Sequence, residues 1–525
     1  MRKITIFDST LRDGAQARGI SFSVEDKIKI AHALDRQGVD YIEAGNPGSN
    51  PKDLAFFQHF AENAKNAPLS HAKLIAFGST RRKGILPEED KNLQALLSAN
   101  TDSVCIFGKS WDFHATNILN ATLEENLAMI SDTVAFLKKH GKEVIFDAEH
   151  FFDGYKKNAD YAMASLKAAQ EGGASCLVLC DTNGGCFPSE IFEIVCTVVA
   201  EFPSTEIGIH THNDCEMAVA NSIMAVQSGA THVQGTFTGF GERCGNANLS
   251  ALIPNLQLKL GYECIPADSM PLLTETARYI SETANVSLNS RAAYVGRSAF
   301  AHKAGMHIDG VTKSSSSFEH VNPEAVGNQR QYLISEVAGG SAMLAKIQKI
   351  DPSLTKGSPQ TAEIIQGIKD REHMGYQYEA AEASLLLFIR KKLGKFAPSF
   401  KLLNFRVIGE RPFDEGRSAS ARIGIEVNGQ RVFTYAEGIG PVGALDKALR
   451  QALINFYPGL AKTYLTDYKV RVLDNKHATE SQVRVLIEST DGKQNWTTVG
   501  SSGDIIDASY QALVDSIEYT LIKQK

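Results

Sequence analysis

The sequence predicts an α/β protein in which a (β/α)8 (TIM) barrel is followed by a helical linker region and a C-terminal α+β domain. Two observations predict the barrel. Short runs rich in β-branched residues recur through the first 240 residues, and each is followed by a stretch of helical period. Eight strand–helix units in about 265 residues match the size of such a barrel. An open, doubly wound sheet is the alternative that this pattern leaves open.

The eight predicted strands cover residues 3–10, 41–45, 73–78, 103–108, 144–150, 176–181, 206–212 and 232–237. Helices are predicted between them. In the segment 24–38, the apolar side chains repeat with helical period and Gly38 is a natural C-cap. In the segment 122–141, Thr122 is predicted as the N-cap, with Glu125 completing a capping box.

The pattern changes twice after the barrel. Residues 266–397 are mostly helical in pattern, and we expect them to form linker subdomains that contribute to the active site. From residue 398, alternating strands and a helix occur twice, with ALDKAL at 444–449 and ASYQAL at 508–513 at equivalent places. The sequence therefore predicts three domains, 1–265, 266–397 and 398–525, the last built from a duplicated ββα unit.

Composition excludes several classes of protein. Lysine and arginine (54) are outnumbered by aspartate and glutamate (60), and no basic tract occurs, so nucleic acid is not an expected partner. No stretch approaches the roughly 18 apolar residues that a membrane helix needs, so no membrane partner is expected either. The eight cysteines form no CxxC pair and no signal segment precedes them, which favours free thiols and a cytoplasmic location.

The clearest chemical signal is the segment HTHND at 210–214. Residues two apart on a strand share a face, so His210 and His212 present two imidazoles to the barrel mouth, where active sites of this fold lie. Asp13, in the loop after the first strand, is predicted to add a carboxylate. Two histidines and one carboxylate suit a divalent metal with positions left for a chelating substrate. The alternative is a pair of histidines that only bond to their neighbours.

Other polar residues fall at strand ends. Arg12 is a candidate cation for an oxyanion, or else a salt bridge that ties the first strand to its neighbours. Asn246 lies in the Gly-rich run GFGERCGNA at 239–247, which lets backbone approach a ligand. Glu149 and Thr182, at the ends of the fifth and sixth strands, either orient a substrate and tune a proton transfer or are structural.

A further pair of histidines lies outside the predicted barrel. His302 and His307 occur in the segment 300–310, in which Gly305 precedes His307 and Gly310 follows it. An imidazole on such a segment is a reasonable general acid or base. A solvated loop is the alternative reading.

Three motifs in order carry a family resemblance. DSTLRDGAQ at 8–16, HTHND at 210–214 and GFGERCGNA at 239–247 together resemble the α-isopropylmalate synthase and homocitrate synthase family, which are metal-dependent acyltransferases built on a TIM barrel. The tail is similar to the C-terminal regulatory domain of that family, so the resemblance covers essentially the whole chain. Within the family, the segments 106–114 and 147–155 look most like the citramalate synthase group, which condenses pyruvate with acetyl-CoA.

The resemblance implies roles for particular residues. The implied metal ligands are Asp13, His210, His212 and Asn246. The implied catalytic residues are Arg12 as oxyanion stabiliser and Glu149 and His307 in proton transfer. The implied substrate contacts are Arg12, Thr182, Asp147 and His302. Two departures stand out: Asp147 replaces the small serine expected in isopropylmalate synthases, and Phe318 stands where related enzymes offer a tyrosine hydroxyl.

The function that this resemblance implies is a Claisen-type condensation of acetyl-CoA with pyruvate, giving citramalate and CoA for isoleucine biosynthesis. The cofactor would be Mg²⁺, Mn²⁺ or Zn²⁺. The tail implies a homodimer with a site for an amino-acid effector, isoleucine or leucine, or else a purely architectural dimerisation domain. The alternative activity is that of a 2-isopropylmalate synthase, with 2-oxoisovalerate as acceptor in leucine biosynthesis. A non-catalytic metabolite sensor is the remaining alternative.

Overall fold

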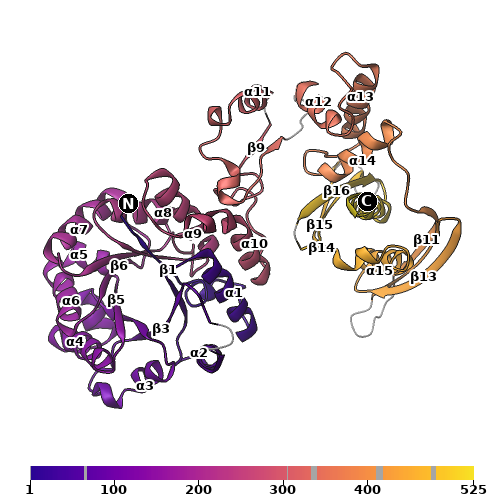
Figure 1. Cartoon of the computed structure of the whole chain (residues 1–525). Coiled ribbons are helices and arrows are strands. Elements are labelled where there is room, and N and C mark those ends of the chain that lie inside the picture. Colours follow the sequence, from indigo (N-terminus) through magenta and orange to yellow (C-terminus); the bar gives the residue numbers. More distant parts are fainter. Residues whose placement is uncertain are drawn as a thin grey trace. The chain divides into compact units, whose positions relative to one another are not determined.

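The computed structural model describes residues 2–63, 68–303, 305–332, 340–409, 418–473, 481–492 and 494–524. The chain divides into two compact units. The first comprises Met1–Ala301 and Glu319–Gln331, and the second comprises His302–Phe318 and Tyr332–Lys525 (Figure 1). The sequence-based boundaries after residues 265 and 397 stay predictions.

A closed barrel of eight parallel strands forms the centre of the first unit. Strand β1 pairs with β8 as well as with β2, so the sheet has no free edge, and the open-sheet alternative is wrong. The strands are β1 (Thr5–Asp8), β2 (Tyr41–Gly45), β3 (Lys73–Ser79), β4 (Ser103–Lys109), β5 (Glu143–Glu149), β6 (Cys176–Asp181), β7 (Glu206–Thr211) and β8 (His232–Gly235). All eight predicted strands are present.

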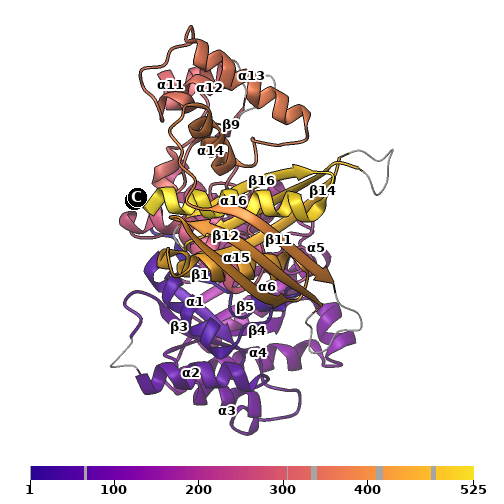
Figure 2. The same cartoon turned by 90° about the vertical axis from the view of Figure 1, so that its right-hand side faces the viewer.

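Helices surround this barrel (Figures 1 and 2). They are α1 (Val24–Gln37), α2 (Pro51–Asn63), α3 (Lys91–Ser98), α4 (Leu123–Lys139), α5 (Phe151–Lys157), α6 (Ala159–Gly172), α7 (Pro188–Glu201), α8 (Ala218–Gln227), α9 (Leu249–Pro254) and α10 (Leu273–Thr283). Gly38 ends α1 with a left-handed φ of 83°, as predicted. The predicted capping box of α4 is wrong: Thr122 caps the helix, but the Glu125 carboxylate accepts from the Arg81 guanidinium and the Gly84 amide instead.

The barrel interior is a packed apolar core. Inward-facing side chains of several strands, among them Phe7, Ile75, Cys105, Ile145 and Val178, pack together in it. Because this core closes the middle of the barrel, polar side chains gather at the ends of the strands. The end that carries the loops after the strands is the mouth of the barrel.

Two short strands, β9 (Ala301–His302) and β10 (Gln331–Tyr332), each span a boundary between the two units along the chain. The helices of the second unit before the C-terminal repeat are α11 (Gly305–Lys313), α12 (Gly340–Gln348), α13 (Pro359–His373) and α14 (Glu382–Lys392). Helix α14 packs on the last sheet of the chain, where the Ser384 hydroxyl accepts from the Val499 amide at 3.0 Å. Among the described residues, no helix is long and apolar enough to cross a membrane.

The repeat is larger than predicted, because each copy has three strands instead of two. The first copy is β11 (Lys401–Gly409), β12 (Ala419–Val427), β13 (Gln430–Gly438) and α15 (Pro441–Leu453), and the second is β14 (Tyr464–Val472), β15 (Val483–Thr490), β16 (Asn495–Ser502) and α16 (Ile505–Gln524). Strands β11 and β14 are edge strands with mostly exposed or half-buried side chains, so they show no clear buried face.

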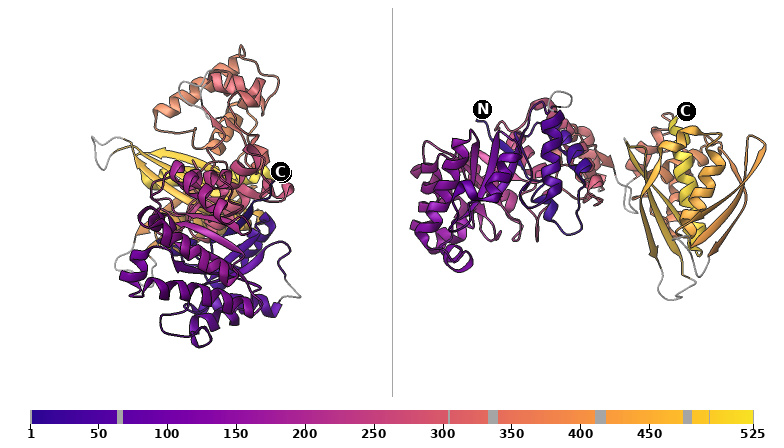
Figure 3. Two further views of the ribbon diagram at one scale, coloured as in Figure 1. Left: turned by 90° about the vertical axis from the view of Figure 1, so that its left-hand side faces the viewer. Right: turned by 90° about the horizontal axis from the view of Figure 1, so that it is seen from below.

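The internal repeat is confirmed by equivalent contacts. Thr434 donates its hydroxyl to the Ala448 carbonyl at 2.7 Å, and Thr498 donates to the Ala512 carbonyl at 2.8 Å. Both members of the second pair lie 64 residues after those of the first. Helices α15 and α16 pack against each other and share one apolar core (Figure 3).

Candidate active site

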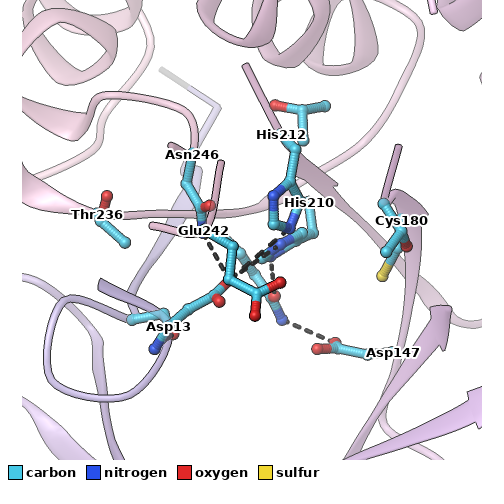
Figure 4. Close-up of polar contacts among 12 residues, drawn as sticks. Asp13, Asp147, Cys180, His210, His212, Thr236, Glu242 and Asn246 are labelled. Atoms are coloured by element: carbon cyan, nitrogen blue, oxygen red, sulfur yellow. Dashed lines mark hydrogen bonds and ion pairs between the residues drawn. The ribbon is translucent and has the colours of Figure 1, made fainter. Parts of the chain in front are cut away.

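Three predicted metal ligands meet at the mouth of the barrel. Asp13 lies in the loop after β1, His210 lies in β7, and His212 directly follows that strand. The Asp13 carboxylate is 3.5 Å from His210 Nε2 and 3.9 Å from His212 Nε2 (Figure 4). All three side chains are buried, and together they form a group that could hold a metal ion.

Asn246 completes this arrangement from the loop after β8. Its amide nitrogen donates to Asp13 at 2.6 Å, so its amide oxygen is the atom left for a ligand. That oxygen is buried and has no hydrogen-bond partner among the described residues. A buried acceptor without a hydrogen-bond partner costs about 1–3 kcal/mol, which favours a bound cation or hydrogen-bond donor beside it. The four residues therefore fit a divalent cation.

The charges of the group suit metal binding. Burial tends to raise the pKa of Asp13, but the positive Arg12 and the two imidazoles lower it to about 2. Burial and the neighbouring His210 lower the pKa of His212 to about 3. At neutral pH, Asp13 is therefore ionised and His212 is neutral, the forms in which both side chains bind metals.

Arg12 is held as a fixed cation beside this group. Its Nε donates to Glu43 of β2 at 2.7 Å, its Nη1 is 3.5 Å from Asp13, and its guanidinium lies 3.7 Å from the Phe77 ring centroid. Although burial lowers the pKa of Arg12, the carboxylates of Glu43 and Asp13 raise it above its ordinary value. The salt bridge to a neighbouring strand, weighed as an alternative role for Arg12, is thus present and also orients the guanidinium.

A chain of hydrogen bonds orients His210. Gln234 of β8 donates its amide nitrogen to Asp147 at 2.9 Å, and its amide oxygen lies 2.9 Å from His210 Nδ1. Because the carboxylate accepts from the amide nitrogen, the amide oxygen must face His210, so Nδ1 donates and Nε2 keeps its lone pair for a metal. Sequence reasoning missed Gln234. Its inward position on β8, the strand beside the His210 strand, was the available signal.

Replacing Gln234 with leucine, a side chain of similar size, is expected to weaken metal binding by about 10–100-fold, the usual effect of losing a partner of a metal-ligating histidine. Titration calorimetry with Mn²⁺ measures this change. The matched control is Gln37→Leu, which removes a buried amide of α1 that donates to the Ser269 carbonyl. Equal Mn²⁺ affinities in the two variants would contradict the orienting role.

Glu149 and Thr182 lie at the ends of β5 and β6, as predicted. The Glu149 carboxylate forms an ion pair with Lys109 of β4. The Thr182 hydroxyl accepts from the His150 amide at 2.9 Å, and the Thr182 carbonyl accepts from Arg243 at 2.6 Å. These contacts place both residues on the rim of the mouth, and their roles toward a substrate stay predictions.

His302 and His307 belong to the second unit. His302 is buried in β9, whereas His307 is exposed on α11 and its ring stacks on Phe318 at a centroid distance of 4.2 Å. The structure thus brings together the four residues of the metal group with Arg12 and Asp147. The catalytic assignment of the two histidines stays a prediction.

Comparison with known proteins covers nearly the whole chain. Residues 3–273 match the HMGL-like family, residues 294–375 match the homocitrate synthase post-HMGL domain-like family, and residues 379–521 match the LeuA allosteric (dimerisation) domain. An (R)-citramalate synthase of Geobacter sulfurreducens is 51% identical over 526 residues, covering 100% of this chain and 99% of the relative. The chain belongs to the citramalate synthase family.

Other relatives agree with this placement. An (R)-citramalate synthase of Aquifex aeolicus is 50% identical over 524 residues, covering 100% of this chain and 98% of the relative. A probable 2-isopropylmalate synthase of Methanopyrus kandleri is 30% identical over 519 residues, covering 98% of each chain. The family resemblance inferred from the sequence is confirmed. Enzymes of the HMGL-like family use a divalent metal, consistent with the group at the barrel mouth.

Proposed function

We propose that the chain condenses acetyl-CoA with pyruvate to give citramalate and CoA, in the biosynthesis of isoleucine. The observation that carries this proposal is 51% identity to an (R)-citramalate synthase along the entire chain, against 30% to a probable 2-isopropylmalate synthase. The identity extends over the barrel, the linker region and the C-terminal repeat, so it includes every part from which a substrate contact is expected. The buried ligand group at the mouth is the kind of site that such a reaction needs.

The residues at the mouth would share the chemistry as follows. A divalent metal, Mg²⁺, Mn²⁺ or Zn²⁺, held by Asp13, His210, His212 and Asn246 would polarise the keto group of a chelating 2-oxo acid. Arg12, fixed by Glu43, would stabilise the negative charge that develops on the former keto oxygen.

The remaining predicted residues would bind the acid and move protons. Thr182 would contact the carboxylate of the 2-oxo acid through its hydroxyl, with His302 among the further substrate contacts. His307, assisted by Glu149, would remove a proton from the methyl group of acetyl-CoA, and the resulting enolate would attack C2 of pyruvate. Water would then hydrolyse the thioester and release CoA. In the structure, Asp147 holds Gln234, so its contribution to the substrate pocket would be indirect.

The activity is tested by thiol release from acetyl-CoA in the presence of Mg²⁺ or Mn²⁺. Pyruvate, 2-oxoisovalerate and 2-oxoglutarate are offered in parallel to the purified chain, and pyruvate is expected to give the highest kcat/KM. A preference for 2-oxoisovalerate would move the chain to the 2-isopropylmalate synthase activity. Thiol release with none of the three acids would contradict acyl transfer and favour the sensor alternative.

We further propose that the chain is a homodimer with isoleucine as its effector, through the region that matches the LeuA allosteric (dimerisation) domain. In support, the outer faces of the repeat carry large exposed side chains, such as Phe433 (51% exposed), Tyr435 (57%) and Tyr464 (55%). Patches of exposed large apolar side chains mark interfaces between proteins. The free cysteines of the chain also fit the proposed cytoplasmic location.

Isoleucine is therefore expected to lower the rate of thiol release from pyruvate and acetyl-CoA, whereas leucine at the same concentration leaves it within about twofold of the uninhibited rate. Sedimentation velocity on the same sample is expected to give the mass of two chains. A chain that sediments as a monomer, or that responds to leucine and not to isoleucine, would contradict this part of the proposal.

A further inference from the structure

A second cluster of metal-type ligands lies inside the barrel, at the opposite ends of the strands from the mouth. Cys176, Glu206 and His232 are the first residues of β6, β7 and β8. The strand register pairs Cys176 with Glu206, and it pairs His232 with Gly208, two residues further along β7. One ligand atom from each of the three side chains lies within 4.8 Å of the other two.

His232 is the member of this cluster that most needs a partner. It is fully buried, and neither of its ring nitrogens has a hydrogen-bond partner among the described residues. The rings packed on it are those of Phe7, at a centroid distance of 5.3 Å, and Tyr41, at 6.2 Å. Because each unsatisfied buried polar atom costs about 1–3 kcal/mol, an imidazole in this position points to a ligand that uses its lone pair.

Gly208 provides the space for such a ligand. A Cβ atom at this position would lie 3.0 Å from His232 Cδ2 and 3.3 Å from Cys176 Sγ, so a side chain there would crowd both groups. Without it, the thiol and the imidazole face each other across β7. Glu206 lies on the same face of β7 as Gly208 and is half-buried, so it forms the side of the cluster nearest to solvent.

Glu206 is held in place by two hydroxyl groups. Its Oε1 accepts from Thr231 at 3.1 Å and from Thr5 at 3.4 Å. These contacts come from β1 and from the residue before β8, so they orient the carboxylate without using the histidine. A carboxylate oriented in this way needs little rearrangement to bind a cation.

We propose that Cys176, Glu206 and His232 bind a second divalent ion, Zn²⁺, at this end of the barrel. A thiolate, an imidazole and a carboxylate are the ligand types that Zn²⁺ combines in proteins, and water can supply the fourth position. Mg²⁺ and Mn²⁺ prefer oxygen ligands, so the thiolate makes this site selective for a softer ion than the mouth requires. The bound ion would join the starts of three neighbouring strands and stabilise the closed barrel.

Cobalt substitution of the full-length chain tests the proposal. Co²⁺ bound to a thiolate gives a charge-transfer band in the near ultraviolet, which oxygen and nitrogen ligands do not give. The mouth group contains no sulfur, so this band reports on a cysteine site alone. The wild-type chain is expected to bind two Co²⁺ ions and to show the band, which added Zn²⁺ removes. One Co²⁺ ion per wild-type chain, without the band, overturns the proposal.

Two variants assign the cysteine. Cys176→Ser is expected to bind one Co²⁺ ion and to lose the band, because the thiolate ligand is gone. Cys264→Ser is the matched control: it changes another fully buried thiol, outside this cluster, and should keep two ions and the band. A band that persists in Cys176→Ser contradicts the assignment and points to Cys105, which forms another possible metal group with Glu43 and Asp147. If Cys176→Ser does not fold, the Co²⁺ spectra of the wild-type chain and of His232→Gln test the proposal in its place.

Discussion

Replacing Asp13 with asparagine is expected to abolish turnover, because the group at the mouth loses the carboxylate that lies beside both histidines. Asp13 is ionised at neutral pH and lies 3.5 Å and 3.9 Å from the two imidazoles. Residues behind metal ligands usually contribute about 10–100-fold to affinity, so a charged ligand is expected to contribute more than about 100-fold. Calorimetric titration with Mn²⁺ and thiol release from acetyl-CoA measure the two effects.

Asp35→Asn is the matched control for this substitution. Asp35 is also a buried carboxylate, but it lies on α1 and accepts from the backbone amides of Ser70, His71 and Ala72, which directly precede β3 and so lie at the opposite strand ends from the mouth. Its replacement should lower the free energy of unfolding and leave Mn²⁺ affinity unchanged. If Asp13→Asn retains wild-type Mn²⁺ affinity, the mouth group is not the metal site.

Replacing Arg12 with alanine is expected to lower kcat by about 10²–10³-fold, the usual effect of removing one donor to a developing oxyanion. Metal affinity should change much less, because Arg12 is not among the ligands. The variant should also unfold more easily. Glu43 is fully buried, and removing the partner of a buried charge costs about 3–5 kcal/mol.

A double variant separates the two effects of Arg12. In Arg12→Ala with Glu43→Gln, the Glu43 charge is no longer left unpaired, so urea unfolding should recover much of the lost stability while kcat stays low. Arg81→Ala is the control for stability alone, since Arg81 is a buried arginine paired with Asp132 and Glu125. An Arg12→Ala variant with wild-type kcat would rule out the oxyanion role.

The sequence alone was sufficient to predict the barrel and most of the metal group. Repeating strand–helix units determine a parallel sheet, and in a closed parallel barrel all strand ends converge on one mouth. Asp13 and His210, which are far apart in the chain, therefore had to lie near each other. The two-residue period of a strand placed His212 beside His210 in the same way. These inferences need only the local residue pattern and the topology, and the amino-acid sequence determines both.

Tertiary structure alone decided which partners each polar side chain has. Arg12 reaches Glu43, Gln234 joins Asp147 to His210, and Glu125 bonds to Arg81 instead of completing its own capping box. Each of these contacts joins different strands or helices, so its existence depends on barrel register and rotamers, which no local pattern encodes. The same reason explains why the sequence did not indicate His232 as a ligand. A lone histidine at the start of a strand can be recognised as a ligand only when Cys176 and Glu206 are seen to lie near it on the neighbouring strands.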